Sequence, residues 1–149
     1  MTHTMTKLTL HGFLLALVPL AAPATVLAAE PLPPDQAFKL KVSVRGPNTL
    51  IAELTPAPKH YLYRSKVSFA LKNASGVLIR QVQLPAGEVK NDPFFGQMEV
   101  YRKPIQAEIT MDRTPKAKSF TLLARYQGCN ETIGVCYPPI DKSFDLTLP

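Results

Sequence analysis

The sequence predicts an all-β protein, a β-sandwich of the immunoglobulin-like class, and three observations support this. Apolar and polar residues alternate in many short runs, which is the period of a half-buried strand. Turn-forming residues separate these runs about every 8–12 residues, the spacing typical of a sandwich. No stretch keeps a helical period, and 15 prolines with no tryptophan favour short elements broken by turns.

Length and composition narrow the possible classes. A chain of 149 residues has room for one domain, and 46% hydrophobic residues can form a core. Two cysteines are too few for a disulfide-framework miniprotein or a four-ligand zinc site. The basic residues are scattered along apparent strands, so we expect a solvated sheet face and no nucleic-acid binding.

The first 29 residues read as a targeting segment. Lys7 precedes an apolar run over residues 12–29, and small residues end the run at Ala28 and Ala29. Two prolines interrupt it and no stop-transfer charges follow, which favours a cleaved signal peptide over a membrane anchor. We expect a signal peptide over residues 1–29 and a periplasmic domain over residues 30–149. Removing Lys7 lowers the formal charge from +6 to +5.

The mature sequence begins with a Pro-rich leader and continues with short strands. The leader covers residues 30–35, and we expect it to be irregular. The strands expected in the first half are residues 38–44, 50–54, 61–63, 67–71 and 77–84. Turn formers such as Arg45-Gly46-Pro47-Asn48 and Asn73-Ala74-Ser75-Gly76 lie between them.

The second half of the chain follows the same pattern after one irregular stretch. Residues 91–96 place two aromatic residues among turn formers, and aromatic side chains in a loop need an apolar surface to cover. The strands expected beyond it are residues 98–101, 105–111, 120–126 and 144–148.

The one segment with distinctive chemistry is Tyr126–Pro139, which holds both cysteines, Cys129 and Cys136. Alternating runs flank it, so we expect the thiols at the mouth of a β-hairpin, joined as an intramolecular disulfide. Their Cα atoms should then lie roughly 4.4–6.8 Å apart. The pair is either a structural staple or a working redox couple. A disulfide that served only stability would contribute more elsewhere in the chain. The chain-entropy model gives a stabilisation of about 2.5 kcal/mol for closing an eight-residue loop, against about 4.3 kcal/mol for a loop of sixty residues.

Several segments together resemble a known family. Tyr126-Gln127-Gly128-Cys129 and Cys136-Tyr137-Pro138-Pro139 are similar to the cysteine segment of the N-terminal periplasmic domain of the thiol:disulfide interchange protein DsbD. Other segments match the same domain in the same order, over almost the whole mature chain. They are Asp35–Phe38, Tyr61–Arg64, Val82–Pro85, Asp92–Gly96 and Glu99–Arg102.

The resemblance implies an immunoglobulin-like sandwich with an active-site hairpin and a cap loop. It also implies a protein-disulfide reductase component that relays reducing equivalents to thioredoxin-like periplasmic proteins, including disulfide isomerases and cytochrome c maturation proteins. Cys136 would form the mixed disulfide with the partner and Cys129 would resolve it. Phe94, with Phe95 beside it, would cap the pair. Three residues would line the site: Tyr61, Tyr63 and Asp92.

The sequence departs from the family pattern in three places. The segment between the cysteines is one residue longer, and Pro93 stands where an acidic residue is expected, which puts acidic tuning of the thiols in doubt. The sequence reaches Pro149 without a transmembrane region or a thioredoxin-like domain. We therefore expect either a stand-alone form that works with a separate DsbD-type membrane protein, or a fragment.

Two other interpretations stay open. A non-catalytic immunoglobulin-like binding module would use the disulfide only as a staple. A copper-handling role would use soft ligands, and the candidates are Met98, Cys129, Cys136 and His60. His60 otherwise reads as a turn residue beside two prolines. We expect no cofactor and no resident metal. No lysine or histidine adjoins the cysteines, so we expect thiols without strong activation of their own.

Overall fold

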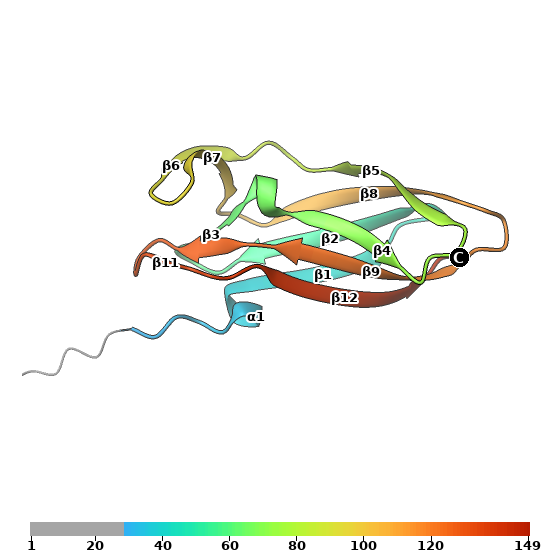
Figure 1. Cartoon of the computed structure of the whole chain (residues 1–149), viewed down its shortest axis with the longest axis horizontal. Helices are drawn as coiled ribbons and strands as arrows, with labels where there is room; N and C mark the ends of the chain where they lie inside the picture. Colours follow the sequence, from blue (N-terminus) through green and yellow to red (C-terminus); the bar gives the residue numbers. More distant parts are fainter. Residues whose placement is uncertain (1–28) are drawn as a thin grey trace, which may run out of the picture.

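The computed structural model describes residues 29–149, which form two packed antiparallel sheets with a third sheet at one end, called the small sheet here because its five strands are short (Figure 1). The first sheet has the strand order β1-β2-β8-β5 and the second has the order β12-β9-β4. In the first sheet the strands are β1 (Phe38–Val44), β2 (Thr49–Pro56), β5 (Val77–Gln83) and β8 (Ile105–Arg113); in the second they are β4 (Ser68–Lys72), β9 (Ser119–Tyr126) and β12 (Ile140–Thr147).

The alternation in the sequence produces the sandwich core. Along β8, Ala107, Ile109 and Met111 are buried, while the residues between them are more exposed. On β9, Phe120 and Leu122 are buried in the same cluster, so the inner faces of both sheets contribute to one core. Each strand places every second side chain on that face, as period-two burial requires.

The third sheet has the order β11-β10-β3-β7-β6 (Figure 1). It contains two hairpins, β6–β7 and β10–β11, with β3 between them. One face of this sheet packs on a second core cluster, which includes Phe38, Leu54, Leu62, Tyr101 and Tyr126. The opposite face is therefore free to form a site. Its strands are β3 (His60–Tyr63), β6 (Glu88–Asp92), β7 (Gly96–Tyr101), β10 (Gly128–Asn130) and β11 (Val135–Cys136).

The all-β sandwich prediction is confirmed, with differences at some element boundaries. The leader contains one helical turn, α1 (Pro34–Ala37), where proline is tolerated because it occupies the first turn. A 3₁₀ turn, η1 (Arg64–Lys66), separates β3 from β4. Strand β12 begins at Ile140, earlier than the apolar alternation indicated, because it pairs with β9 along its whole length.

One strand was not expected from the sequence. Residues 88–92 form strand β6, although Glu-Val-Lys-Asn-Asp has little strand propensity. It forms because β7 pairs with it over five residues, and it lies at the edge of the small sheet. Between Ala29 and Pro149, no helix is both long and apolar enough to cross a bilayer. The expected signal peptide lies almost entirely outside the described residues.

Candidate functional site

Cys129 and Cys136 face each other across the β10–β11 hairpin and form a disulfide. Their Cα atoms are 3.9 Å apart, closer than the range expected from sequence, and the two residues are direct partners in the strand pairing. Cys129 is 2% exposed, whereas Cys136 at the hairpin edge is only partly buried. The two sulfurs therefore differ in access to a partner.

The turn between the cysteines is closed by its own polar groups. The Asn130 side-chain oxygen accepts hydrogen bonds from the backbone N–H of Thr132 at 2.9 Å and of Ile133 at 3.3 Å. Gly134 has a φ of 65°, a conformation that glycine adopts without strain. The backbone N–H of Glu131 donates to the Lys59 carbonyl, which ties the turn to the start of β3. The turn therefore has hydrogen bonds of its own in addition to the disulfide.

Strand register places the site residues on one face of the small sheet. Tyr61 pairs with Cys129, and Cys129 pairs with Cys136, so these side chains point the same way. Tyr63, two residues after Tyr61, shares that face and pairs with Val100. Tyr61, Tyr63, Val100 and Cys129 accordingly form one buried cluster, with Met98 and Cys136 packed against it.

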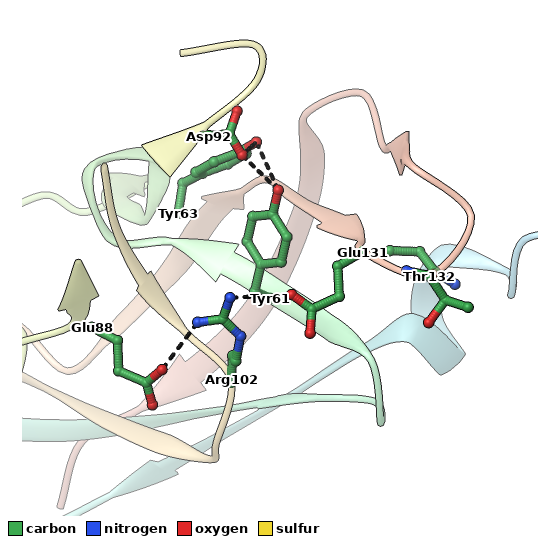
Figure 2. A network of polar contacts seen from close by, with 8 residues as sticks. Tyr61, Tyr63, Glu88, Asp92, Arg102, Glu131 and Thr132 are labelled. Atoms are coloured by element: carbon green, nitrogen blue, oxygen red, sulfur yellow. Dashed lines mark hydrogen bonds and ion pairs between the residues drawn. The ribbon is translucent and has the colours of Figure 1, made fainter. Parts of the chain in front are cut away.

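A buried carboxylate, Asp92, joins the two tyrosines (Figure 2). Tyr61 donates to Asp92 Oδ2 at 2.6 Å, and Tyr63 donates to the same oxygen at 2.8 Å. The Tyr63 hydroxyl also lies 3.0 Å from Cys129 Sγ and 3.7 Å from Cys136 Sγ. Since its single proton goes to Asp92, the Tyr63 oxygen presents lone pairs to the sulfurs and can accept a hydrogen bond from a reduced Cys129.

The protonation states of this network follow from burial and hydrogen bonding. Burial, reinforced by the bond to Asp92, raises the pKa of Tyr61 to about 12. Burial and the bonds to Tyr61 and Asp92 likewise raise the pKa of Tyr63. Burial alone would raise the pKa of Asp92, but the hydrogen bonds that it accepts outweigh burial and lower it. At neutral pH the tyrosines are neutral donors and Asp92 is an ionised acceptor.

The other oxygen of Asp92 holds the loop that follows β6. Asp92 Oδ1 accepts from the backbone N–H of Phe94 at 2.9 Å and of Phe95 at 3.1 Å. One carboxylate therefore fixes the tyrosines beneath it and the loop above it. Gly96, with a φ of 75°, turns the chain back into β7.

The two phenylalanines of this loop differ in position. The Phe95 ring packs edge-on against Tyr63, with centroids 5.1 Å apart, and the Lys66 ammonium lies 5.0 Å from the Phe95 centroid. Within the described part of the chain, Phe95 is thus the loop ring that packs on the site, while Phe94 is 60% exposed. The cap role of Phe94 that the family resemblance implies stays a prediction.

A charged network that sequence reasoning missed surrounds Tyr61. Arg102 Nη1 lies 3.0 Å from Glu88 Oε2, and its Nη2 lies 3.1 Å from Glu131 Oε2 (Figure 2). Arg102 and Lys90 also lie over the Tyr61 ring, 5.7 and 5.1 Å from its centroid. These residues are dispersed along the sequence, and only the pairing of β3 with β7 and β10 would have indicated that they share a face.

The copper candidates are not brought together as one set. Met98 packs near the disulfide, but His60 precedes Tyr61 on β3 and points to the other face. His60 is a buried strand residue rather than the turn residue that its proline neighbours suggested. Its ring nitrogens lie 2.9 Å from the Pro58 carbonyl oxygen and 3.3 Å from the Tyr137 hydroxyl. Its role is therefore local packing.

Comparisons with known proteins agree with this geometry. A family model described as "Thiol:disulfide interchange protein DsbD, N-terminal" matches residues 28–148. The chain is 38% identical over 112 residues to a thiol:disulfide interchange protein DsbD 1 of Pseudomonas aeruginosa, a match covering 75% of this chain and 18% of the relative. It is 34% identical over 120 residues to DsbD of Cronobacter sakazakii, covering 80% of this chain and 20% of that protein. The chain thus spans about a fifth of the length of these relatives.

Solved structures also match. The DsbD N-terminal domain of Neisseria meningitidis in its reduced form superposes with a TM-score of 0.67 at 34% identity, covering 78% of this chain and 89% of that one. The complex between the DsbD N-terminal and PilB N-terminal domains of the same organism matches with a TM-score of 0.65 at 32% identity, covering 79% of this chain and 88% of that one.

Proposed function

The chain belongs to the family of DsbD N-terminal domains, and from this membership we propose that it relays reducing equivalents to partner proteins by thiol-disulfide exchange at Cys129 and Cys136. The observation that carries the proposal is the disulfide itself. It bridges adjacent strands at the edge of the small sheet, beside Tyr63 and the carboxylate that holds residues 94 and 95.

The exchange proceeds in two steps. In the reduced protein, the Cys136 thiolate attacks one sulfur of a partner disulfide. A mixed disulfide forms, the partner's bond breaks, and its second sulfur leaves as a thiolate that takes up a proton. Cys129 then attacks the Cys136 sulfur, closing the intramolecular disulfide and releasing the partner as a dithiol. Two electrons and two protons pass to the partner, and a donor dithiol reverses the sequence to reload the domain.

The difference in burial supports these roles. The partly buried Cys136 is the sulfur that a partner reaches, and the 2% exposed Cys129 is protected from a second partner. The Tyr63 hydroxyl oxygen lies 3.0 Å from Cys129 Sγ, within reach of a hydrogen bond from a Cys129 thiol in the reduced protein. The alternative, a binding module in which the disulfide is only a structural staple, is less favoured. The disulfide joins two neighbouring strands that already pair, and it does not connect one sheet to another.

A redox titration tests the proposal. In dithiothreitol mixtures followed by thiol alkylation, we expect the disulfide to be reduced reversibly, with a reduction potential above about −300 mV. Structural disulfides typically have reduction potentials below that value. Circular dichroism should show that the reduced protein keeps its fold. Unfolding on reduction, or a deeply negative potential, would assign the bond to the staple interpretation.

We propose that residues 92–96 act as a lid that slows chance oxidation of the reduced cysteines. Replacing Phe95 with alanine removes the ring that packs on Tyr63, so the reduced protein should oxidise faster with a small disulfide. Phe94→Ala should also accelerate oxidation and change stability little, because its side chain is 60% exposed. Stopped-flow oxidation and urea unfolding measure both effects.

The matched control for the lid is Leu78→Ala, which truncates an exposed apolar residue on β5 in the other part of the molecule. It should leave the oxidation rate unchanged. If Phe94→Ala leaves oxidation unchanged and lowers stability by several kcal/mol, as a large core truncation does, then Phe94 only packs.

The compartment and partners follow from the same family membership. We propose export by a signal peptide over residues 1–29, a mature domain over residues 30–149, and action in the periplasm. The partners that we propose are thioredoxin-like periplasmic proteins as donor and acceptors, including proteins of cytochrome c maturation. The complex of a related DsbD N-terminal domain with a PilB N-terminal domain supports partner docking by this kind of domain.

A further inference from the structure

The hairpin that carries the cap loop has few backbone links to the rest of the protein. Strand β6 pairs only with β7 in the described sheet. Strand β7 in turn pairs with β3 through two residue pairs, Leu62 with Tyr101 and Tyr63 with Val100. Side chains must therefore supply much of the restraint that fixes this cap hairpin, residues 88–101, against Tyr61 and Tyr63.

Arg102 lies at the base of this hairpin and reaches both neighbours. It follows Tyr101, the last residue of β7, so the register places it beside Tyr61 in the row that continues to Cys129 and Cys136. Its guanidinium contacts Glu88 on the cap hairpin at 3.0 Å and Glu131 on the turn between the cysteines at 3.1 Å. Figure 2 shows the guanidinium beside Tyr61, with these two carboxylates on either side of it.

The chemistry of this contact suits a geometric restraint. A planar guanidinium can bond two carboxylates with different nitrogens, whereas a lysine ammonium acts as a point charge. The hydrogen bond to Glu131 raises the pKa of Arg102, with a further contribution from Glu88. The Arg102 side chain is 31% exposed and that of Glu131 is 33%, so solvent weakens this pair less than a fully exposed one.

We propose that Arg102 is a positioning residue that links the cap hairpin to the cysteine hairpin. It contacts neither sulfur, and acts by holding Glu88, Tyr61 and Glu131 in one arrangement. Tyr61 in turn donates to Asp92, which holds the cap loop. A partner that displaces the cap therefore also loosens the turn between the cysteines. This inference rests on the proposed exchange function.

The test is Arg102→Met, which keeps an apolar stem over Tyr61 but removes both ion pairs. The matched control is Arg125→Met, which removes another two-contact arginine–carboxylate pair, to Asp141 at 2.6 and 2.9 Å, between β9 and β12. The reduced proteins are oxidised with the neutral reagent 2-hydroxyethyl disulfide, and amide hydrogen exchange is followed in the oxidised proteins.

In Arg102→Met we expect oxidation and cap-amide exchange to accelerate about three- to tenfold, the range that loss of a partly exposed ion-pair network supports. The faster amide exchange should be confined to residues 88–96 and 129–136. Arg102→Lys should restore only part of the protection. Arg125→Met should leave the oxidation rate and both segments unchanged.

Two results would overturn the proposal. One is an unchanged oxidation rate with unchanged exchange at residues 88–96. The other is a uniform rise in exchange over the whole sandwich, which marks a general stability effect. If Arg102→Met does not fold, Glu131→Gln removes the charge of one ion pair and leaves Arg102 over Tyr61, and it should loosen the same segments to a smaller extent. Failure of wild-type reduction to reverse would refute the exchange function, while the hydrogen-exchange comparison would still decide the role of Arg102.

Discussion

Cys136→Ser is expected to abolish disulfide exchange, whereas Cys129→Ser is expected to stop the reaction halfway with the partner attached. The expectation follows from access: Cys136 is partly exposed at the sheet edge and Cys129 is 2% exposed beneath Tyr63. Without Cys136 no sulfur reaches the partner. Without Cys129 the mixed disulfide has no resolving thiol, because the second step needs a thiolate within reach of the Cys136 sulfur.

Non-reducing electrophoresis with mass spectrometry of protein exported to the periplasm measures this asymmetry. Cys129→Ser should yield mixed disulfides through Cys136, and the trapped proteins identify the donor and acceptors. Cys136→Ser and the double variant should yield none above background. Equal trapping by the two single variants would show that burial does not assign the roles, and trapping by neither would count against exchange with proteins.

Gly128→Ala is expected to lower the free energy of unfolding by about 3 kcal/mol or more, at the upper end of the range for overpacking. A Cβ added at Gly128 would lie 2.2 Å from the Tyr61 carbonyl oxygen and 2.7 Å from Phe38 Cζ. The carbonyl belongs to the β3 backbone that pairs with Gly128, and Phe38 is buried at 1% exposure, so neither can yield cheaply. The added methyl would also push Cys129 away from Tyr63.

Urea unfolding with Gly134→Ala as the control isolates this close approach. Gly134 lies in the same hairpin with open space around its Cα, and its φ of 65° makes alanine strained there by about 1–2 kcal/mol. Gly128→Ala should therefore be clearly the more damaging of the two. A smaller loss for Gly128→Ala than for Gly134→Ala would mean that β3 and β10 can separate without penalty.

The cysteine hairpin and the strands of the sandwich were predictable because their signals are local. In residues 105–111 and 120–126 every second residue is apolar, and a strand that buries one face requires that period. Cys129 and Cys136 lie between two such runs, so a hairpin pairing them was expected. Their register as direct partners, with Cα atoms 3.9 Å apart, was not, since the turn length alone does not fix which residues pair.

Strand β6 and the different positions of Phe94 and Phe95 could not be predicted from the local sequence. Glu88–Asp92 has no apolar alternation and forms a strand only because its backbone pairs with β7. Adjacent phenylalanines look equivalent in sequence, but the two bonds from Asp92 Oδ1 set the loop so that Phe95 packs on Tyr63 and Phe94 remains 60% exposed.

The fold class and the placement of both cysteines in one hairpin were predictable from the sequence, because they depend on periodicity along the chain. The resemblance to the DsbD N-terminal domain added Tyr61, Tyr63 and Asp92 as expected site residues. Which side chains contact one another depends on the strand pairing. Asp92 reaches Tyr61 and Tyr63, and Arg102 reaches Glu88 and Glu131, only once β3 lies between β7 and β10. These contacts join residues that are 14 to 31 positions apart, and strand pairing brings them onto one face whatever their separation in the sequence.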